Sequence, residues 1–325
     1  MSTVFSLNDL KTSFATKRGP LYAVRGVTLS LDAGECLGIV GESGSGKTVM
    51  WRAAMGLLRG KRVTRQGSVT LDGAELLTMT EKEVRQLWGT KIAMVFQDPM
   101  TALNPVRRIG SQISEALVKR LGMSKDEAAA RTLELLRLVR MPETEKLVRK
   151  FPHQLSGGMR QRVMIAMAIA CNPKVLLADE PTTALDVTVQ AQVLDLLSEL
   201  REKLGMAMVI VTHDLGIVAG HSDRIAVMYA GEIVELATTV DLFSNTRMPY
   251  TEALLNSIPK LTDTSGSRMR AIPGSPPDPI ATTAGCFFAP RCEYATDRCR
   301  NEHPELVDDG SGHAYRCFFP LGKGK

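Results

Sequence analysis

One eight-residue segment constrains the fold of this 325-residue chain more than any other. The sequence GESGSGKT at 41–48 directly follows the apolar run 36–40 and precedes a helical run at 49–58. This order of strand, glycine loop and helix is what a phosphate-binding P-loop requires. Glycines let consecutive backbone N–H groups face an anion, and the N-terminus of the following helix adds positive partial charge. The segment therefore predicts an α/β fold that binds a polyphosphate.

Individual positions of this loop carry distinct expected roles. Lys47 should reach the β- and γ-phosphates of a nucleotide, and Thr48 should ligate Mg²⁺. The backbone and hydroxyl groups of the preceding positions should line the phosphates. These positions are Gly41, Ser43, Gly44, Ser45 and Gly46.

Two carboxylates follow a second apolar strand, at 175–178. Asp179 and Glu180 stand where a parallel sheet presents its ligands, at the carboxyl ends of the strands. Asp179 is suited to hold the magnesium shell, and Glu180 is suited to polarise an attacking water. Paired acids at a strand end are often only solvated surface groups, but the P-loop upstream favours the catalytic interpretation.

The order of periodic segments predicts three parts. Short strands with turn punctuation form the opening third, and helix spacing dominates from about 111 to 149. Strand signals return on either side of a strong helix at 187–204, which implies a parallel crossover. The strands are expected at 2–7, 26–31, 36–40, 67–71, 174–178 and 206–212.

Composition and charge indicate an ordinary globular protein. Hydrophobic residues make up 44% and charged residues 23%, which excludes a disordered or fibrous chain. The longest apolar run, at 163–171, is far shorter than the about 20 residues of a membrane-spanning helix, and the N-terminus has no secretory signal pattern. The missing signal pattern predicts a cytoplasmic protein. The net charge of +5 comes from scattered basic residues, so we expect no nucleic acid as a partner.

The segment LSGGMRQR at 155–162 resembles one superfamily, the ABC ATPases. Three further motifs occur in the order of that family: Gln97 in VFQDP, Ala184-Leu185-Asp186 after the two acids, and His213 in VTHD. The resemblance implies the ABC fold, with a RecA-like parallel core, an antiparallel β subdomain and a helical subdomain at about 100–170, all within residues 1–260.

The resemblance also implies a shared ATP site. In such ATPases two nucleotide domains meet head to tail, and Ser156, Gly157 and Gly158 would contact the γ-phosphate held by the partner. His213 would bridge that phosphate and the opposing subunit.

Three more positions take roles from the same resemblance. Gln97 would sense Mg²⁺ and the membrane subunit, and Asp186 would couple the two sites. An aromatic side chain should stack on adenine, with Phe14 as the better candidate and Tyr22 as the alternative.

The sequence after the core narrows the branch. MPYTEALLNSIP at 248–259, PGSPPDP at 273–279 and GCFFAPRCEYATDRC at 285–299 resemble the ATPase subunits of dipeptide and oligopeptide importers. Nickel and glutathione importers share this branch. The resemblance implies a C-terminal extension at 261–325, and a peripheral place on the cytoplasmic face of the inner membrane. The implied partners are a second, different ATPase subunit, two permeases and an extracytoplasmic binding protein.

Four of the six cysteines crowd into the tail, at spacing C-x5-C-x6-C-x17-C. Cys286, Cys292, Cys299 and Cys317 lack the C-x2-C pairs of common zinc ribbons. Four soft thiolates could hold an iron-sulfur cluster or a structural zinc, or could remain unliganded or oxidised. In the peptide importers that the chain resembles, this pattern carries a 4Fe-4S cluster.

Two other functions would use the same P-loop. A soluble ABC ATPase that acts on ribosomes, DNA or cluster assembly usually carries a second cassette or a long insertion, and the sequence shows neither. An adenylate or nucleoside kinase would leave LSGG and His213 unexplained. The sequence therefore favours an ATP- and Mg²⁺-dependent transport motor.

Overall fold

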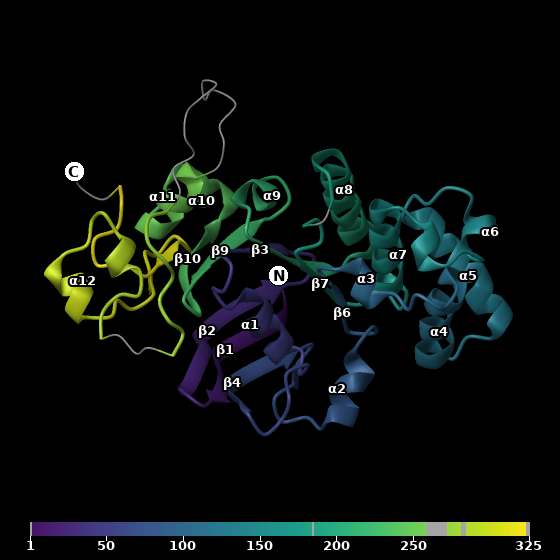
Figure 1. Ribbon diagram of the computed structural model, residues 1–325, viewed down its shortest axis with the longest axis horizontal. Helices are drawn as coiled ribbons and strands as arrows, with labels where there is room; N and C mark the ends of the chain where they lie inside the picture. The colour runs from purple at the N-terminus through teal and green to yellow at the C-terminus, as the bar shows by residue number, and fades with distance from the viewer. Residues whose placement is uncertain (1, 184, 258–271, 281–283, 323–325) are drawn as a thin grey trace. The chain divides into compact units, whose positions relative to one another are not determined.

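The structure is a computed structural model that describes residues 2–183, 185–257, 272–280 and 284–322 (Figure 1). The chain falls into two compact units, which are considered separately. The first unit comprises residues 1–4, 31–35 and 79–211, and the second comprises 5–30, 36–78 and 212–325.

The second unit contains most of an antiparallel sheet in the strand order β2-β1-β4-β5, of which residues 3–4 and 31–32 are assigned to the first unit. Its strands are β1 (Thr3–Thr16), β2 (Gly19–Asp32), β4 (Val63–Leu71) and β5 (Ala74–Glu75). β1 pairs with β4 from Phe5 opposite Leu71 to Phe14 opposite Val63. Both β1 and β2 are longer than the sequence predicts, because their polar outer halves pair through the backbone without an apolar alternation.

A second set of strands in this unit runs in the order β11-β12-β10-β9-β3. β3 is parallel to β9, and the other neighbours are antiparallel. The strands are β3 (Cys36–Val40), β9 (Arg224–Tyr229), β10 (Glu232–Thr238), β11 (Val307–Asp308) and β12 (Ala314–Tyr315). The cysteine-rich tail thus adds strands to the edge at β10.

Every residue of β3 is buried, so its sequence is a continuous apolar run, and the strand leads directly into the P-loop.

Short helices complete the second unit. The helices are α1 (Lys47–Ala54), α9 (Leu215–Ala219), α10 (Thr239–Ser244), α11 (Pro249–Asn256), η2 (Ala289–Arg291) and α12 (Asp297–Asn301).

The first unit holds three parallel strands, β6 (Ile92–Val95), β7 (Val175–Asp179) and β8 (Ala207–Thr212), of which the last residue already belongs to the second unit. β7 pairs with β6 on one side and with β8 on the other. α8 (Val187–Leu204) connects β7 to β8, so the crossover that the sequence predicts is confirmed, with the helix at the predicted residues.

Helices make up most of the rest of this unit. The predicted helical region appears as three helices, because Gly122 ends the first in a left-handed conformation and Ser124 starts the next with a capping box. The helices are α2 (Glu81–Leu87), α3 (Pro99–Ala102), α4 (Ile109–Leu121), α5 (Lys125–Leu138), α6 (Thr144–Leu147), η1 (Pro152–Gln154) and α7 (Gly157–Ile169).

The α/β class with an antiparallel part and a helical part is confirmed. None of the helices in the described residues has a stretch both long and apolar enough to span a lipid bilayer.

Candidate functional site

The P-loop at 41–48 joins β3 to α1 in the second unit. Lys47 is buried, and its ammonium group turns back into the loop. Nζ donates to the carbonyl oxygens of Gly41 at 2.7 Å and Glu42 at 2.9 Å, and lies 3.3 Å from the Ser45 hydroxyl. A single cation is thus held at the centre of the loop, at the N-terminal end of a helix, where an anion would bind.

Two glycines of this loop cannot be replaced without displacing backbone. Gly46 has φ of 102°, and a Cβ atom there would lie 2.3 Å from the Ala23 carbonyl oxygen. A Cβ atom on Gly41 would lie 2.1 Å from the Met228 carbonyl oxygen. The glycine pattern is therefore needed to pass the loop between neighbouring strands, as well as to expose its N–H groups.

The two candidates for adenine stacking lie on neighbouring strands, and both are half-buried. Phe14 stands opposite Val63 near the end of β1. The ring of Tyr22 lies 5.1 Å from the Arg25 guanidinium, and its backbone N–H donates to the Pro279 carbonyl oxygen at 3.1 Å. The geometry leaves both as candidates.

The paired carboxylates lie in the first unit, at the end of β7. Asp179 is buried as the last residue of the strand, and Glu180 follows with φ of 46°, a left-handed conformation that costs a non-glycine residue energy. Gln97 Nε2 donates to Glu180 Oε2 at 2.7 Å, and the Thr183 hydroxyl donates to the same oxygen at 2.9 Å. The structure thus brings together two residues that the sequence places 83 positions apart.

The LSGG segment forms the start of α7, also in the first unit. Ser156 is the N-cap, and its hydroxyl accepts from the Met159 N–H at 3.3 Å. Ser156 and Gly157 are exposed. Gly158 is packed so that a Cβ atom would lie 2.8 Å from the Val189 side chain. A hydroxyl and open helix N–H groups at one exposed end can receive an anion.

The remaining motif residues are divided between the two units. Asp186 caps α8 by accepting from the Val189 N–H at 3.0 Å, while Ala184 lies outside the described residues. His213 is exposed and directly follows β8, in the second unit. Thr48 is the second residue of α1 and is half-buried.

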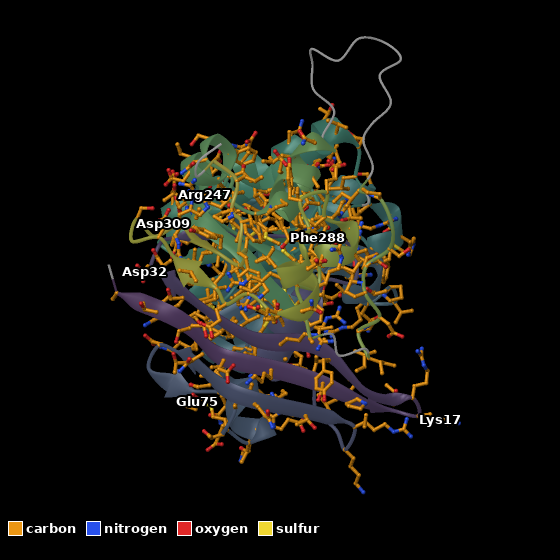
Figure 2. All side chains as sticks on the ribbon, turned by 90° about the vertical axis from the view of Figure 1, so that its left-hand side faces the viewer. Lys17, Asp32, Glu75, Arg247, Phe288 and Asp309 are labelled. Carbon is orange, nitrogen blue, oxygen red and sulfur yellow. The ribbon has the colours of Figure 1, made fainter. Side chains whose placement is uncertain are left out.

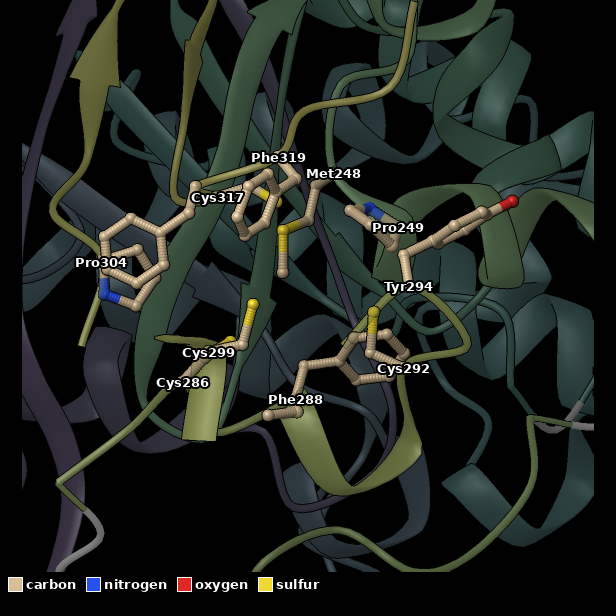
Figure 3. Close-up of a pocket in the computed structure, with 12 residues that line it drawn as sticks. Met248, Pro249, Cys286, Phe288, Cys292, Tyr294, Cys299, Pro304, Cys317 and Phe319 are labelled. Carbon is tan, nitrogen blue, oxygen red and sulfur yellow. The ribbon is translucent and has the colours of Figure 1, made fainter. Parts of the chain in front are cut away.

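The four tail cysteines line one small apolar pocket in the second unit. Figure 3 shows their side chains directed toward a common space, with Met248 and Phe288 among the other lining groups. Burial raises the pKa of the Cys286 and Cys292 thiols, and raises that of Cys317 to about 11. The pocket thus collects four soft donors from positions between 286 and 317 of the tail.

No metal-ligand arrangement is formed by these thiols in the part of the chain that the structure describes. Across the residues that the structure describes, no three His, Cys, Asp or Glu side chains are grouped as ligands of one metal ion. All four tail cysteines are free thiols, with Cys299 buried and the other three half-buried.

The tail that carries them is fixed by buried polar contacts to β10 and to the segment after it. His313 Nε2 lies 2.8 Å from Glu235 Oε1, with both side chains almost fully buried. Arg247 stands 3.9 Å from Asp309, and Figure 2 shows the two side by side at one edge of the unit.

One contact at the P-loop has no sequence signal that predicts it. Arg291, in the cysteine-rich tail, forms a bidentate ion pair with Glu42. The sequence gives only one hint, which is that Arg291 lies within CFFAPRC and Glu42 within GESGSGKT.

Comparison with known proteins gives two family matches. Residues 24–183 match the family described as ABC transporter, and residues 234–299 match the family described as the oligopeptide/dipeptide transporter C-terminal region. The second match covers part of the cysteine-rich tail.

Curated relatives match nearly the whole chain. An oligopeptide transport ATP-binding protein of Bacillus subtilis (strain 168) is 48% identical over 98% of this chain and 97% of its own length. An oligopeptide transport ATP-binding protein of Salmonella typhimurium is 48% identical over 98% of this chain and 95% of its own. A dipeptide transport ATP-binding protein of Haemophilus influenzae is also 48% identical, over 98% and 96%.

Solved structures agree on the fold. A dimeric ATP-binding cassette in a post-hydrolysis state, bound to ADP and Pi, is 31% identical with a TM-score of 0.65, over 72% of this chain and 98% of its own. A cassette from Clostridium perfringens that is part of an ABC transporter complex is 27% identical with a TM-score of 0.64, over 75% and 92%.

Proposed function

The chain belongs to the ABC transporter family, within the branch of oligopeptide and dipeptide transport ATP-binding proteins, and on this basis we propose that it is the ATP-hydrolysing subunit of a peptide importer. The observation that carries the proposal is the P-loop with Lys47 held at its centre, in a chain that is 48% identical to such proteins along almost its full length.

In the second unit, the P-loop binds the triphosphate. Lys47 would bind the β- and γ-phosphates in place of the loop carbonyls, and Thr48 would ligate Mg²⁺. Phe14 or Tyr22 stacks on the adenine. The buried position of Lys47 supports this assignment, because a cation held away from water attracts an anion more strongly.

In the first unit, Glu180 would polarise the attacking water, Asp179 would hold the Mg²⁺ shell and Gln97 would sense the metal. The hydrogen bond from Gln97 to Glu180 supports a shared role, because an amide can hold a carboxylate in place until water and Mg²⁺ arrive. The left-handed backbone at Glu180 is the kind of strain that collects at functional sites.

A second subunit completes the site. Ser156, Gly157 and Gly158 contact the γ-phosphate bound by the partner, His213 bridges the two subunits and Asp186 couples the two sites. The exposure of Ser156 and Gly157 supports this, and the related solved cassette bound to ADP and Pi is dimeric. The second subunit is a different ATPase of the same family, so the pair is a heterodimer.

We infer that the pair sits at the cytoplasmic face of the inner membrane as a peripheral component. It acts there with two permeases and an extracytoplasmic binding protein. The names of the matched relatives, all peptide transport proteins, favour peptides over nickel or glutathione as cargo. They equally favour transport over action on a ribosome, on DNA or on cluster assembly.

Residues 1–260 form the ATPase domain in this proposal, with its helical subdomain at about 100–170, and 261–325 form the peptide-importer extension. The four cysteines of that extension would hold a 4Fe-4S cluster. The lining of one apolar pocket by all four thiols supports this, because soft thiolates are the ligands that such a cluster takes. When bound, the cluster would tie separate stretches of the tail together.

Two experiments test these proposals. Tagged protein from detergent-solubilised membranes should bring permeases with it and hydrolyse ATP. A soluble ribosomal or DNA complex without a permease would refute the transport function. Protein purified without oxygen should contain iron and sulfide and absorb visible light, and zinc or an absence of metal would refute the cluster.

A further inference from the structure

Arg291 links the cysteine-rich tail to the P-loop. In the sequence it lies between Cys286 and Cys292, and its side chain is 4% exposed. Its two terminal nitrogens donate to the two carboxylate oxygens of Glu42, at 2.6 Å and 2.9 Å. Such a bidentate pair fixes both the position and the orientation of the carboxylate, which a single ammonium group could not do.

The same guanidinium is held firmly from its other side. Its Nε donates to the Pro273 carbonyl oxygen at 2.8 Å, and its terminal nitrogens reach the Ile272 carbonyl oxygen at 3.4 Å and the Tyr229 hydroxyl at 3.3 Å. Because all of these partners lie outside the P-loop, they hold Arg291 in place independently of the loop.

Glu42 is also held through its backbone. Its N–H donates to the hydroxyl of Tyr250 at 2.9 Å, and Tyr250 is fully buried. The Tyr250 ring packs 4.5 Å from Tyr229 and 5.2 Å from Phe288. Phe288 lines the cysteine pocket, so one continuous packed cluster connects the pocket to the P-loop.

The position of Glu42 sets the phosphate cradle. Its carbonyl oxygen accepts from Lys47 Nζ at 2.9 Å and from the Ser45 N–H at 3.2 Å. Its carboxylate, within the loop itself, would repel a triphosphate if it carried an uncompensated negative charge. The bidentate pair with Arg291 compensates that charge and holds it in one place.

We propose that Arg291 is a positioning residue for nucleotide binding, which neutralises Glu42 and sets the first turn of the P-loop. This inference rests on the proposed function, because it names a further positioning residue of the same ATP site.

The test is the affinity of the purified full chain for Mg-ATP, measured by calorimetry. Arg291→Met should weaken binding by about 10-fold, within the usual range of coupling between sites. Arg291→Lys should lose less, because the charge remains while the fork is lost. Arg300→Ala, which removes an exposed arginine paired with Asp297 in the same tail, is the matched control and should bind as the wild type does.

A rescue separates this role from general support of the fold. Glu42→Gln combined with Arg291→Met should recover most of the affinity, because the repelling charge is gone. A merely structural Arg291 would show no such recovery. Steady-state ATP hydrolysis should show the same role, because Arg291→Met should raise the KM for ATP and change kcat by less than about 2-fold.

The outcomes distinguish two failures. If Lys47→Ala binds ATP as well as the wild type does, the proposed function is wrong. If Lys47→Ala loses binding but Arg291→Met and Arg291→Lys both keep wild-type affinity, only the positioning role is wrong. Thermal unfolding of each variant checks that it folds. Should Arg291→Met fail to fold, the affinity of Arg291→Lys is compared with that of Arg291→Lys combined with Glu42→Gln.

Discussion

The P-loop and the LSGG segment use the same elements in opposite settings. Each places glycines and a hydroxyl residue at the N-terminus of a helix, where N–H groups can meet an anion. Lys47 in the P-loop is buried and bonded within its own loop, whereas Ser156 is exposed and bonds only its own helix in the contacts described above. This difference agrees with the proposed function, in which the P-loop binds the chain's own nucleotide and the LSGG segment contacts the nucleotide of a partner.

The largest expected effect comes from the enclosed site. Lys47→Ala should lower ATP affinity by about 1,000-fold and abolish hydrolysis, because it removes two or more charge-assisted hydrogen bonds to phosphate. Calorimetry with Mg-ATP measures the affinity. Lys61→Ala removes an exposed lysine of the same unit and should change nothing. Tight binding by Lys47→Ala would mean that the enclosed loop does not hold the nucleotide.

Glu180→Gln should separate binding from chemistry. Hydrolysis by the assembled transporter should fall by about 100-fold or more, because the base that polarises water is lost. ATP affinity should stay the same, since the side chain keeps its shape and its contact with Gln97. Phosphate release and nucleotide binding are measured side by side. Glu199→Gln, at an exposed pair with Arg140, is the control, and undiminished turnover would remove Glu180 from its assigned role.

Ser156→Arg tests the open site directly. The isolated chain should bind ATP normally, whereas hydrolysis by the transporter should fall by about 10-fold or more, because the partner's nucleotide can no longer be covered. Ala130→Arg places the same charge on an exposed position of α5 and serves as a control. Weaker ATP binding by the isolated Ser156→Arg chain would contradict the division between the two regions.

Tyr250→Phe should give the smallest effect. It removes the acceptor for the Glu42 N–H and should weaken ATP binding by about 3-fold, the size of one neutral hydrogen bond. Tyr294→Phe removes a comparable but exposed hydroxyl bond, to Glu252, and should leave the affinity unchanged. Equal losses in both variants would show that the effect is not specific to the P-loop.

Much of the fold follows from local sequence. The glycine loop predicted a strand before it and a helix after it, and both are present as β3 and α1. Apolar periodicity placed α8 at its observed residues. The antiparallel strands β1 and β2 were predicted too short, because their exposed ends depend on pairing with a neighbour and not on their own pattern.

The sequence by itself predicted the residues of the proposed nucleotide site, because the glycines and Lys47 directly follow one apolar strand and the paired acids end another. Only the tertiary structure decided what supports that site. Arg291 meets Glu42 from 249 positions away, and Gln97 meets Glu180 from 83. No local pattern encodes such contacts, because they depend on how strands and turns distant in sequence pack in three dimensions.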